Sequence, residues 1–174
     1  RIAIADRLGS LPLMKVSDCL TDTAQLVLDF ALQTARRELV GKYGTPRCGT
    51  PPREAGFAVI GYGKFGGLEL GYGSDLDLVF LHDSSGAQQE TDGTPPVDNE
   101  RFFSRLVQRL IHFLTIQTTS GRLYEVDTRL RPSGQSGLLV TSLEGFRHYQ
   151  TADAWVWEHQ ALLRGRALAG SRAV

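Results

Sequence analysis

Apolar residues recur at helical spacing in two long segments of the chain. The first runs from Thr21 to about Tyr43, and the second covers residues 102–114. Residues three or four positions apart lie on one face of a helix, so both segments predict amphipathic helices with one buried face. Thr141 and Glu144 match a capping box, which predicts the start of a third helix. The pattern also predicts a final helix over about 154–168.

Shorter apolar runs between these helices predict four strands. They are separated by segments rich in Gly, Pro and polar residues, of which 45–54 and 83–100 are expected to be loops. A small sheet covered by helices belongs to the α+β class or to a mixed α/β arrangement. The expected strands are 57–60, 75–81, 124–130 and 138–140.

Composition limits the function without naming it. The 174 residues are enough for one domain with a core, and 19 Lys and Arg balance 19 Asp and Glu. A neutral chain has no overall basic field, so nonspecific nucleic-acid binding is not expected. No apolar run is long enough to cross a membrane, and Cys19 and Cys48 lack the spacing of a zinc site or a disulfide framework. These features predict a cytoplasmic protein. Because the first residue is Arg1, we expect a piece of a longer protein.

The most informative motif is a pair of carboxylates at the start of the second expected strand. Asp75 and Asp77 are one residue apart and precede the apolar run 78–81. Alternate residues of a strand project to the same face, with Cα atoms ~7 Å apart, so the two carboxylates can share a divalent cation. The alternative is a charged pair on an exposed strand face. The pair therefore predicts a Mg²⁺ site with one or two ions.

A glycine-rich segment, 61–67, precedes this pair. Gly61, Gly63 and Gly66 formally match the dinucleotide-binding fingerprint, but the aspartates come too early for the crossover helix and ribose-binding acid of that fold. The spacing around Lys64 does not match a P-loop either. The remaining interpretation is a turn that cradles phosphate, with Lys64 as a cation for a triphosphate. A flexible turn with a solvated lysine is the alternative.

The order of strand and carboxylates separates two classes of Mg²⁺ enzyme. In phosphatases with an aspartyl nucleophile, the apolar strand precedes the aspartates, whereas here the apolar run follows them. A carboxylate pair introduced by Gly73 and Ser74 at the start of a strand resembles nucleotidyltransferases of the polymerase-beta-like superfamily. That superfamily also has a third carboxylate on a later strand.

Asp127 can supply that third carboxylate. In the expected strand 124–130, alternation places Glu125, Asp127 and Arg129 on one face. A face with this much charge is costly to bury unless its groups pair or bind metal, so it predicts an active-site wall rather than a surface ladder of ion pairs. Arg129 and Arg131 are candidate phosphate ligands, and the sequence leaves open which of them contacts phosphate.

Together these motifs resemble the glutamine synthetase adenylyltransferase family, whose members also remove the adenylyl group. The resemblance covers nearly the whole chain. It implies the polymerase-beta-like nucleotidyltransferase fold, and it is closer to the carboxy-terminal, adenylylating domain of the family than to the amino-terminal, adenylyl-removing one. The motifs that carry it are Gly61–Lys64 with Gly66 and Gly67, Glu69–Tyr72, Ser74–Asp77, Tyr124–Asp127, Arg129–Gly134 and Trp155–Leu162.

The resemblance implies a reaction in which AMP is transferred from ATP to a tyrosine hydroxyl of glutamine synthetase and pyrophosphate leaves. Asp75, Asp77 and Asp127 would hold the metal, with Asp127 also as the general base. The leaving phosphates would contact the residues named as phosphate ligands. These are Gly61, Gly63, Lys64, Gly73, Ser74, and Arg129 or Arg131.

The opposing adenylyl-removing reaction and a catalytically idle ATP-binding domain are the alternatives. A PII-type regulatory protein is expected as a partner of the full-length family, but the domain that would bind it is absent here. We expect 1–54 to form a helical part and linker, 55–142 the catalytic sheet with its helix, and 143–174 carboxy-terminal helices within one nucleotidyltransferase domain, 1–174. Trp155 and Trp157 are expected to pack in the core or between helices.

Overall fold

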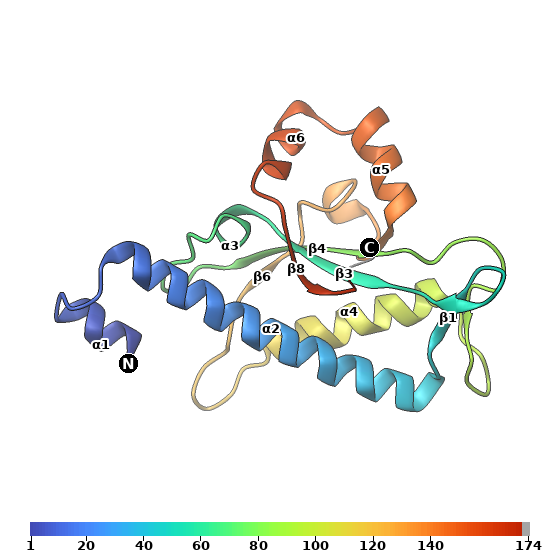
Figure 1. The fold of residues 1–174 in the computed structure, drawn as a ribbon, viewed down its shortest axis with the longest axis horizontal. Helices are drawn as coiled ribbons and strands as arrows, with labels where there is room; N and C mark the ends of the chain where they lie inside the picture. Colours follow the sequence, from blue (N-terminus) through green and yellow to red (C-terminus); the bar gives the residue numbers. More distant parts are fainter. Residues whose placement is uncertain (172–174) are drawn as a thin grey trace.

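The computed structural model describes residues 1–171, which form a mixed α+β fold with a main sheet and a smaller second sheet (Figure 1). The expected fold class is therefore confirmed. In chain order the elements are α1 (Ile2–Arg7), α2 (Leu13–Tyr43), β1 (Pro46–Cys48), β2 (Arg53–Glu54), β3 (Phe57–Gly61), α3 (Gly63–Gly66), β4 (Leu76–His82), β5 (Glu90–Thr91), α4 (Asn99–Thr115), β6 (Val126–Asp127), a 3₁₀ turn (Gly134–Ser136), β7 (Thr141–Ser142), α5 (Leu143–Ala152), α6 (Val156–Leu162) and β8 (Arg166–Gly170).

The main sheet has the order β6-β4-β3-β8, and β7 also pairs with β4. β3 runs antiparallel to both β4 and β8, whereas β6 and β7 run parallel to β4. The parallel pairing sets Leu76 opposite Val126 and Asp77 opposite Asp127. Strand β4 is thus the centre of the sheet, and its first residues lie beside β6.

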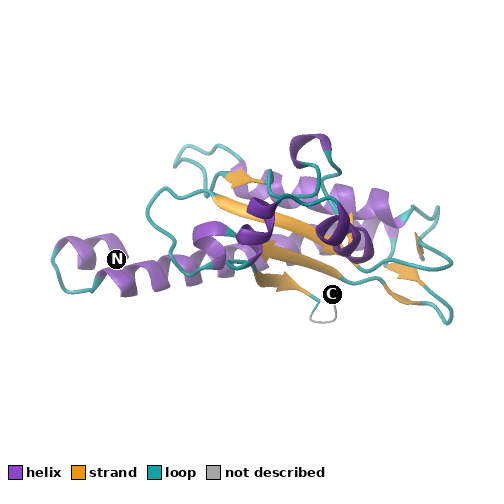
Figure 2. Cartoon of the chain, turned by 90° about the horizontal axis from the view of Figure 1, so that it is seen from above, coloured by secondary structure: helices purple, strands orange, loops and turns teal. Residues whose placement is uncertain are grey.

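Helices cover both faces of this sheet. Figure 1 shows α2 and α4 together on one face and α5 with α6 on the other. Figure 2, from above, shows α1 and the start of α2 extending beyond the sheet. Leu76, Leu78 and Phe80 join the main core with α2 and α4, while Val79 and Leu81 pack in a second cluster with residues of α5 and α6. A buried Leu or Phe side chain stabilises the fold by about 1.5–3 kcal/mol, so this alternation fixes which face each residue of β4 occupies.

The two long helices are both longer than the apolar pattern predicts. α4 begins at Asn99 because the carboxylate of Asp98 accepts hydrogen bonds from the backbone N–H groups of Glu100 and Arg101. α2 begins at Leu13, directly after Pro12, rather than at Thr21. Its first two turns carry exposed Leu13 and Met14, so their helical state leaves little trace in the apolar spacing.

Three sequence predictions near the end of the chain are wrong. The expected strand over 138–140 is displaced to β7, and the helix that follows is capped by Ser142 rather than Thr141. The expected helix over 154–168 ends at Leu162. Residues 166–170 instead form strand β8, which completes the sheet beside β3. The alanines and leucines of this segment favour a helix locally, but pairing with β3 overrides that preference.

The predicted loops contain short strands. Segment 45–54 contributes β1 and β2, and segment 83–100 contributes β5 and the first turn of α4. These strands form the second sheet in the order β2-β1-β5. Two-residue and three-residue strands have too few side chains for a periodic signal, which explains why the sequence does not reveal them.

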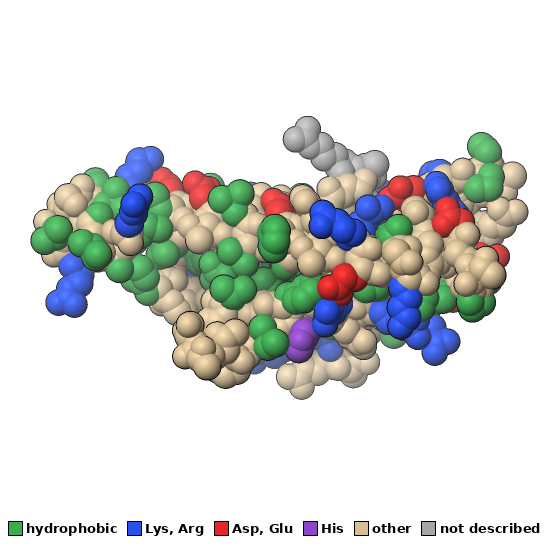
Figure 3. All heavy atoms as spheres, turned by 90° about the horizontal axis from the view of Figure 1, so that it is seen from below, with side chains coloured by type: hydrophobic (Ala, Val, Ile, Leu, Met, Phe, Trp, Pro, Cys, Tyr) green, Lys and Arg blue, Asp and Glu red, His purple; other side chains and the backbone are tan. Residues whose placement is uncertain are grey.

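The expected burial of the two tryptophans is also wrong. Trp155 is 70% exposed and Trp157 is 54% exposed, at the start of α6. Exposed apolar side chains also occur on α2, where Leu26 and Phe30 are one turn apart. Figure 3 shows apolar side chains scattered among charged ones on the lower surface of the molecule. None of the helices that the structure describes combines the length and the apolar character that a bilayer crossing requires.

Candidate active site

Three aspartates meet where β4 starts and β6 lies beside it. Ligand oxygens of Asp75, Asp77 and Asp127 all lie within 4.8 Å of one another. Asp77 and Asp127 face each other in the parallel register, and the Leu76 N–H donates to the Glu125 carbonyl at 2.9 Å. Asp75 lies just before β4 rather than within it. The structure thus brings together all three carboxylates that the sequence indicates, from positions 50 residues apart in the case of Asp77 and Asp127.

Among the three carboxyl groups, the convergence most disfavours the ionised form of Asp77. Partial burial raises its pKa, and the negative charges of Asp75 and Asp127 raise it further. The positive charges of Arg129 and Lys64 act in the opposite direction. The net shift is upward, with burial as its largest cause and the two neighbouring carboxylates as the next.

The negative charge of Asp127 is the best compensated of the three carboxylates. Its carboxylate accepts hydrogen bonds from the Arg129 backbone N–H at 2.8 Å and from the Arg129 Nε at 2.7 Å, and it forms an ion pair with the same guanidinium. The side-chain hydrogen bond from Arg129 is the main cause that lowers the pKa of Asp127. Arg129 itself is largely exposed, with 69% of its side chain accessible. Because the backbone turns back onto Asp127 here, β6 is only two residues long, and the predicted strand over 124–130 is too long.

Arg131 has a different role from Arg129. Its guanidinium donates to the Thr128 carbonyl and hydroxyl, both at 2.7 Å, to the Gln135 carbonyl at 3.1 Å and to the Gly137 carbonyl at 3.3 Å. These bonds close the segment 128–137, which we call the arginine loop, around one side chain. Arg131 therefore holds the loop, and Arg129 is the arginine with an exposed guanidinium beside the aspartates.

Position 63 must be glycine because the Asp77 side chain leaves no room for a side chain there. Its φ is +54°, and a Cβ atom at this position would lie 2.3 Å from Oδ2 of Asp77. The neighbouring Tyr62 N–H donates to the Asp77 carbonyl at 2.9 Å, which holds the turn against β4. Gly61 packs against Leu168 of β8, where a Cβ atom would meet Cδ1 at 2.5 Å. Both glycines thus have structural reasons to be glycine, and their predicted phosphate contacts stay predictions.

The remaining predicted ligands surround the same region. Lys64 is exposed on α3 and contributes to the field at Asp77. Gly73 has a φ of +68°, and a Cβ atom added to it would have no neighbouring atom within 4 Å. The Ser74 hydroxyl accepts a hydrogen bond from the Gly71 N–H at 3.1 Å and so closes the turn that leads into β4.

An open cavity of about 440 Å³ lies beside Asp75 and Asp127 of this cluster. Three carboxylate oxygens within 4.8 Å of one another match the all-oxygen ligand set that Mg²⁺ prefers, and the neighbouring carboxylates contribute to the raised pKa of Asp77. The three aspartates could therefore hold a divalent cation. Gln135 and Thr128 also line the cavity, and no motif in the sequence singles them out. The full lining is Asp75, Glu125, Val126, Asp127, Thr128, Arg129, Arg131 and Gln135.

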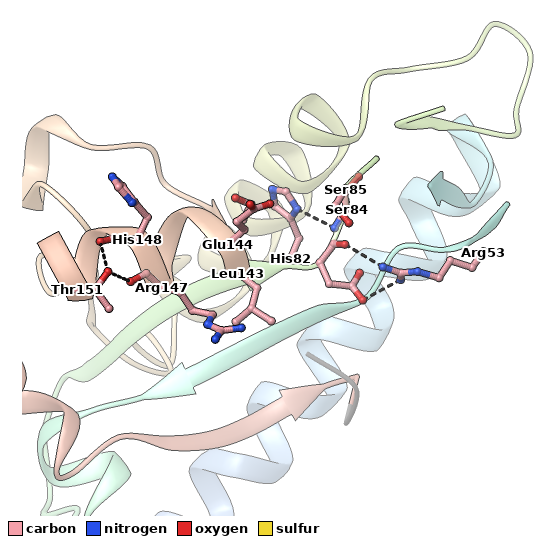
Figure 4. A pocket seen from close by; sticks show the side chains of 11 residues that line it. Arg53, His82, Ser84, Ser85, Leu143, Glu144, Arg147, His148 and Thr151 are labelled. Carbon is pink, nitrogen blue, oxygen red and sulfur yellow. Dashed lines mark hydrogen bonds and ion pairs between the residues drawn. The ribbon is translucent and has the colours of Figure 1, made fainter. Parts of the chain in front are cut away.

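A larger cavity, of about 700 Å³, lies at the opposite end of β4 (Figure 4). Its walls include buried His82, Arg53 with its partner Asp83, and Arg147 of α5. His82 accepts a hydrogen bond from the Ser84 N–H at its Nδ1 and stacks on Phe103. In Figure 4 the charged side chains point in different directions rather than toward one point. The convergence of like charges is therefore found at the aspartates and not in the larger cavity.

Comparison with known proteins indicates the same family that the sequence motifs resemble. A family model described as glutamate-ammonia ligase adenylyltransferase matches residues 1–174. A protein of Thioalkalivibrio sulfidiphilus is 61% identical over 172 residues, which cover 98% of this chain and 18% of that protein. Proteins of Pseudomonas syringae pv. tomato and Nitrosococcus oceani are both 58% identical, over 100% and 98% of this chain and again 18% of theirs. All three are named bifunctional glutamine synthetase adenylyltransferase/adenylyl-removing enzyme. The chain thus spans less than a fifth of the length of these relatives.

Proposed function

The chain belongs to the glutamate-ammonia ligase adenylyltransferase family, and on that premise we propose that it transfers AMP from ATP to a tyrosine hydroxyl of glutamine synthetase. Glutamate-ammonia ligase is another name for glutamine synthetase. The observation that carries the proposal is the convergence of Asp75, Asp77 and Asp127 beside an exposed arginine. Transfer of a nucleotide requires charge neutralisation at phosphate, and the three carboxylates supply oxygen ligands for a cation that would provide it.

Asp75, Asp77 and Asp127 would hold Mg²⁺, and the expected number of ions is two. Bound Mg²⁺ would neutralise charge on the phosphate oxygens and lower the pKa of the attacking tyrosine hydroxyl. Two charges ~4 Å apart repel by ~4 kcal/mol at an effective dielectric of 20, which is the cost that a bound cation would remove from this cluster.

The proposed reaction assigns its proton transfer and one phosphate contact to residues of the chain. The tyrosine oxygen forms a bond to the α-phosphorus of ATP, the bond from that phosphorus to the β-phosphate oxygen breaks, and pyrophosphate leaves. Asp127 is the proposed acceptor of the tyrosine proton. Its present hydrogen bonds to Arg129 make it a weak base, so Arg129 would exchange Asp127 for a phosphate oxygen when ATP binds. This exchange would supply a phosphate ligand and free the base in one movement.

The other phosphate ligands in the proposal are Lys64, Ser74 and backbone groups of Gly61, Gly63 and Gly73. Lys64 is supported by its exposed position and by its effect on Asp77. Arg131 is less suited to contact phosphate because its guanidinium is already bonded within the arginine loop.

The opposing reaction is the second candidate, since the names of the relatives include the adenylyl-removing activity. In that reaction a phosphate oxygen attacks the phosphorus of the adenylyl group, the bond from that phosphorus to the tyrosine oxygen breaks, the tyrosine oxygen regains a proton, and ADP is released. A catalytically idle ATP-binding domain is less well supported, because all three carboxylates are present and close together. A PII-type regulator, a cytoplasmic location and the division at residues 54 and 142 stay predictions.

The decisive experiment uses ATP labelled in its α-phosphate and measures how much label reaches glutamine synthetase. The chain is incubated with unmodified glutamine synthetase, Mg²⁺ and labelled ATP, and the synthetase is then separated and counted. Label on the synthetase supports adenylylation, provided that Asp75→Asn with Asp77→Asn abolishes it.

A second arm starts from synthetase that is already labelled with AMP and adds phosphate. Release of labelled ADP in this arm, with no incorporation in the first, assigns the adenylyl-removing reaction instead. No incorporation of label in the first arm and no release of labelled ADP in the second, while the chain still binds ATP, assigns the idle domain.

A further inference from the structure

A further cavity lies next to the open cavity beside Asp75 and Asp127, which we call the carboxylate cavity. Its volume is about 260 Å³. It is lined by segments 70–74 and 122–125, which lead into β4 and β6, and by Leu20 of α2, which passes this end of the sheet (Figure 1). We call it the side slot. The proposed mechanism gives it no ligand.

The side slot and the carboxylate cavity are adjacent. Glu125 lines both of them. Ser74 lines the side slot, and the next residue, Asp75, lines the carboxylate cavity. A group bound in the side slot can therefore extend into the carboxylate cavity, which Asp127 also lines.

Hydrogen bonds fix both walls of the side slot. In the wall before β4, the Ser74 N–H donates to the Gly71 carbonyl at 3.2 Å, and the Gly71 N–H donates to the Ser74 hydroxyl at 3.1 Å. In the wall before β6, the Tyr124 N–H donates to the Leu114 carbonyl at 3.0 Å, and the Tyr124 ring packs against the main core. The slot is thus largely formed before a ligand binds, as is usual for binding sites.

The surface of the side slot is mainly apolar and aromatic. Leu70 is buried, whereas Tyr72 and Leu123 are 54% and 58% exposed. The charged side chains at the slot, Arg122 and Glu125, form an ion pair with each other, so they suit a neutral ligand better than a phosphate group. An apolar cavity of about 150 Å³ is enough to bind benzene, so the slot has room for one aromatic side chain.

The position of the side slot fits the acceptor of the reaction rather than the leaving group. Gly61, Gly63 and Lys64, which are proposed phosphate ligands, belong to the turn after β3. The slot lies where the chain enters β6, with Gly73 and Ser74 at its boundary toward the carboxylates, and β3 and β6 lie on opposite sides of β4. The attacking and leaving oxygens of a transferred phosphoryl group are roughly in line, on opposite sides of phosphorus. The acceptor is therefore expected on the β6 side.

We propose that the side slot binds the ring of the tyrosine that accepts AMP, with the tyrosine hydroxyl directed into the carboxylate cavity toward Asp127. This inference rests on the proposed function. It applies to both directions of the reaction, because the same tyrosine side chain is the acceptor in one and the product in the other. Tyr72 and Leu123 contact the ring from the protein side, where an aromatic pair adds to the burial of apolar area.

The test measures binding of the protein substrate and of ATP separately. Tyr72→Ala with Leu123→Ala removes two exposed side chains from the slot and leaves the core intact. The KM for glutamine synthetase is expected to rise ~10-fold, while the Kd of a nonhydrolysable ATP analogue with Mg²⁺ stays within ~2-fold. An unchanged KM for the synthetase overturns the proposal. A loss of ATP affinity of the same size would place adenine in the slot and overturn it as well.

Leu26→Ala with Phe30→Ala is the matched control. It also removes one leucine and one aromatic side chain, which are 71% and 74% exposed on α2 and do not line the slot. Both the KM for the synthetase and the Kd of the ATP analogue are expected to stay at their wild-type values. An equal rise in KM in the two double variants would attribute the effect to a general loss of apolar surface and refute the slot.

A binding measurement on the wild-type chain does not depend on AMP transfer. N-acetyltyrosinamide, titrated into the chain with Mg²⁺, is expected to shift NMR resonances of residues 70–74 and 122–125, with ~10-fold weaker binding in the Tyr72 and Leu123 double variant. N-acetylalaninamide should cause no such shifts. Absence of shifts, shifts confined to other residues, or equal shifts with the alanine compound sink the proposal. If the wild-type chain neither adds nor removes AMP, the proposed function fails, while this titration still decides whether the slot binds a tyrosine side chain.

Discussion

The two ends of strand β4 use polar residues in opposite ways. At its end, His82 accepts from the Ser84 N–H, and Asn99 donates to the Ser84 hydroxyl and to the Arg47 carbonyl, both at 2.8 Å. These groups pair with one another, except that the Oδ1 of Asn99 is buried without a hydrogen-bond partner. At its start, Asp75 and Asp77 face a third carboxylate, and the pKa of Asp77 is raised. One strand therefore carries a largely paired polar network at its end, which we call the closed end, and three converging carboxylates at its start.

The largest effect is expected at the three converging carboxylates. Mg²⁺ with a nonhydrolysable ATP analogue at ~100 times its Kd should stabilise the chain by ~2.7 kcal/mol, or a rise of ~5–10 °C in Tm. Asp75→Asn with Asp77→Asn should abolish this rise and lower AMP transfer by more than ~100-fold. Thermal melts with and without ligand provide the measurement.

Asp22→Asn with Glu90→Gln is the control for that experiment. It also removes two negative charges, both from exposed positions away from the carboxylates. This variant should keep the full ligand-induced rise in Tm. An equal rise in the Asp75 and Asp77 double variant would disprove the metal site.

The closed end should respond in stability rather than in ligand binding. Asn99→Ala leaves the Arg47 carbonyl and the Ser84 hydroxyl without their donor, and Asn99 is fully buried. Loss of a buried hydrogen-bond partner costs ~2 kcal/mol, which corresponds to ~4–8 °C in Tm for a chain of this size. The rise produced by Mg²⁺ and the ATP analogue should be unchanged. A smaller rise would show that the two ends are coupled.

A third variant tests whether metal binding at the start of β4 depends on the neighbouring turn at Gly63. Gly63→Ala places a Cβ atom against Oδ2 of Asp77 at a positive φ. Mg²⁺ affinity, measured by calorimetry with the ATP analogue present, should fall ~10-fold because the carboxylate must move. Gly9→Ala has the same backbone strain, with a φ of +66° and no atom within 4 Å of the added carbon. It should lose stability without losing affinity, so equal affinity in both variants would refute the role of the turn.

The smallest effect concerns pH in the absence of metal. Because the folded-state pKa of Asp77 is raised, the folded state loses stability as pH rises through that pKa, and Asp77→Asn should remove this loss. Because the pKa of Asp127 is lowered, its contribution is present at neutral pH and disappears on acidification, so Asp127→Asn should act in the opposite direction. Melts in EDTA between about pH 4 and 7 should show Tm changes of opposite sign at neutral pH. Changes of the same sign would contradict this balance of charges.

The sequence predicts the start of β4 better than it predicts the rest of the sheet. Local spacing and strand alternation place Asp75 and Asp77 on one face, whereas Asp127 is joined to them through the resemblance to a superfamily with a third carboxylate on a later strand. The structure brings the three together. The length of β6 does not follow, since the strand ends when Arg129 turns back onto Asp127. Such a bond depends on backbone geometry that alternation cannot reveal.

Strand β8 and the exposed tryptophans escape prediction for a related reason. Arg166–Gly170 has the composition of a helix, but its partner β3 lies more than 100 residues earlier. Trp155 and Trp157 are large and apolar, yet α6 presents them to solvent and buries Glu158 instead. Pairing over such distances and the orientation of a two-turn helix are decided by tertiary contacts, which a single sequence does not encode in its periodicity.

The position of β8 sets the order in which the sheet can be completed during synthesis. β3 and β4 are close in sequence and can pair as soon as they leave the ribosome, whereas β8 must wait for residues 166–170. Until then β3 has an open edge, Gln25 lacks its bonds to Arg166 and Leu168, and the turn at Gly61 lacks the side chain that packs against it. We therefore expect a nascent chain to complete the turn beside Asp77 only after β8 has emerged, when the carboxylates themselves have long been made.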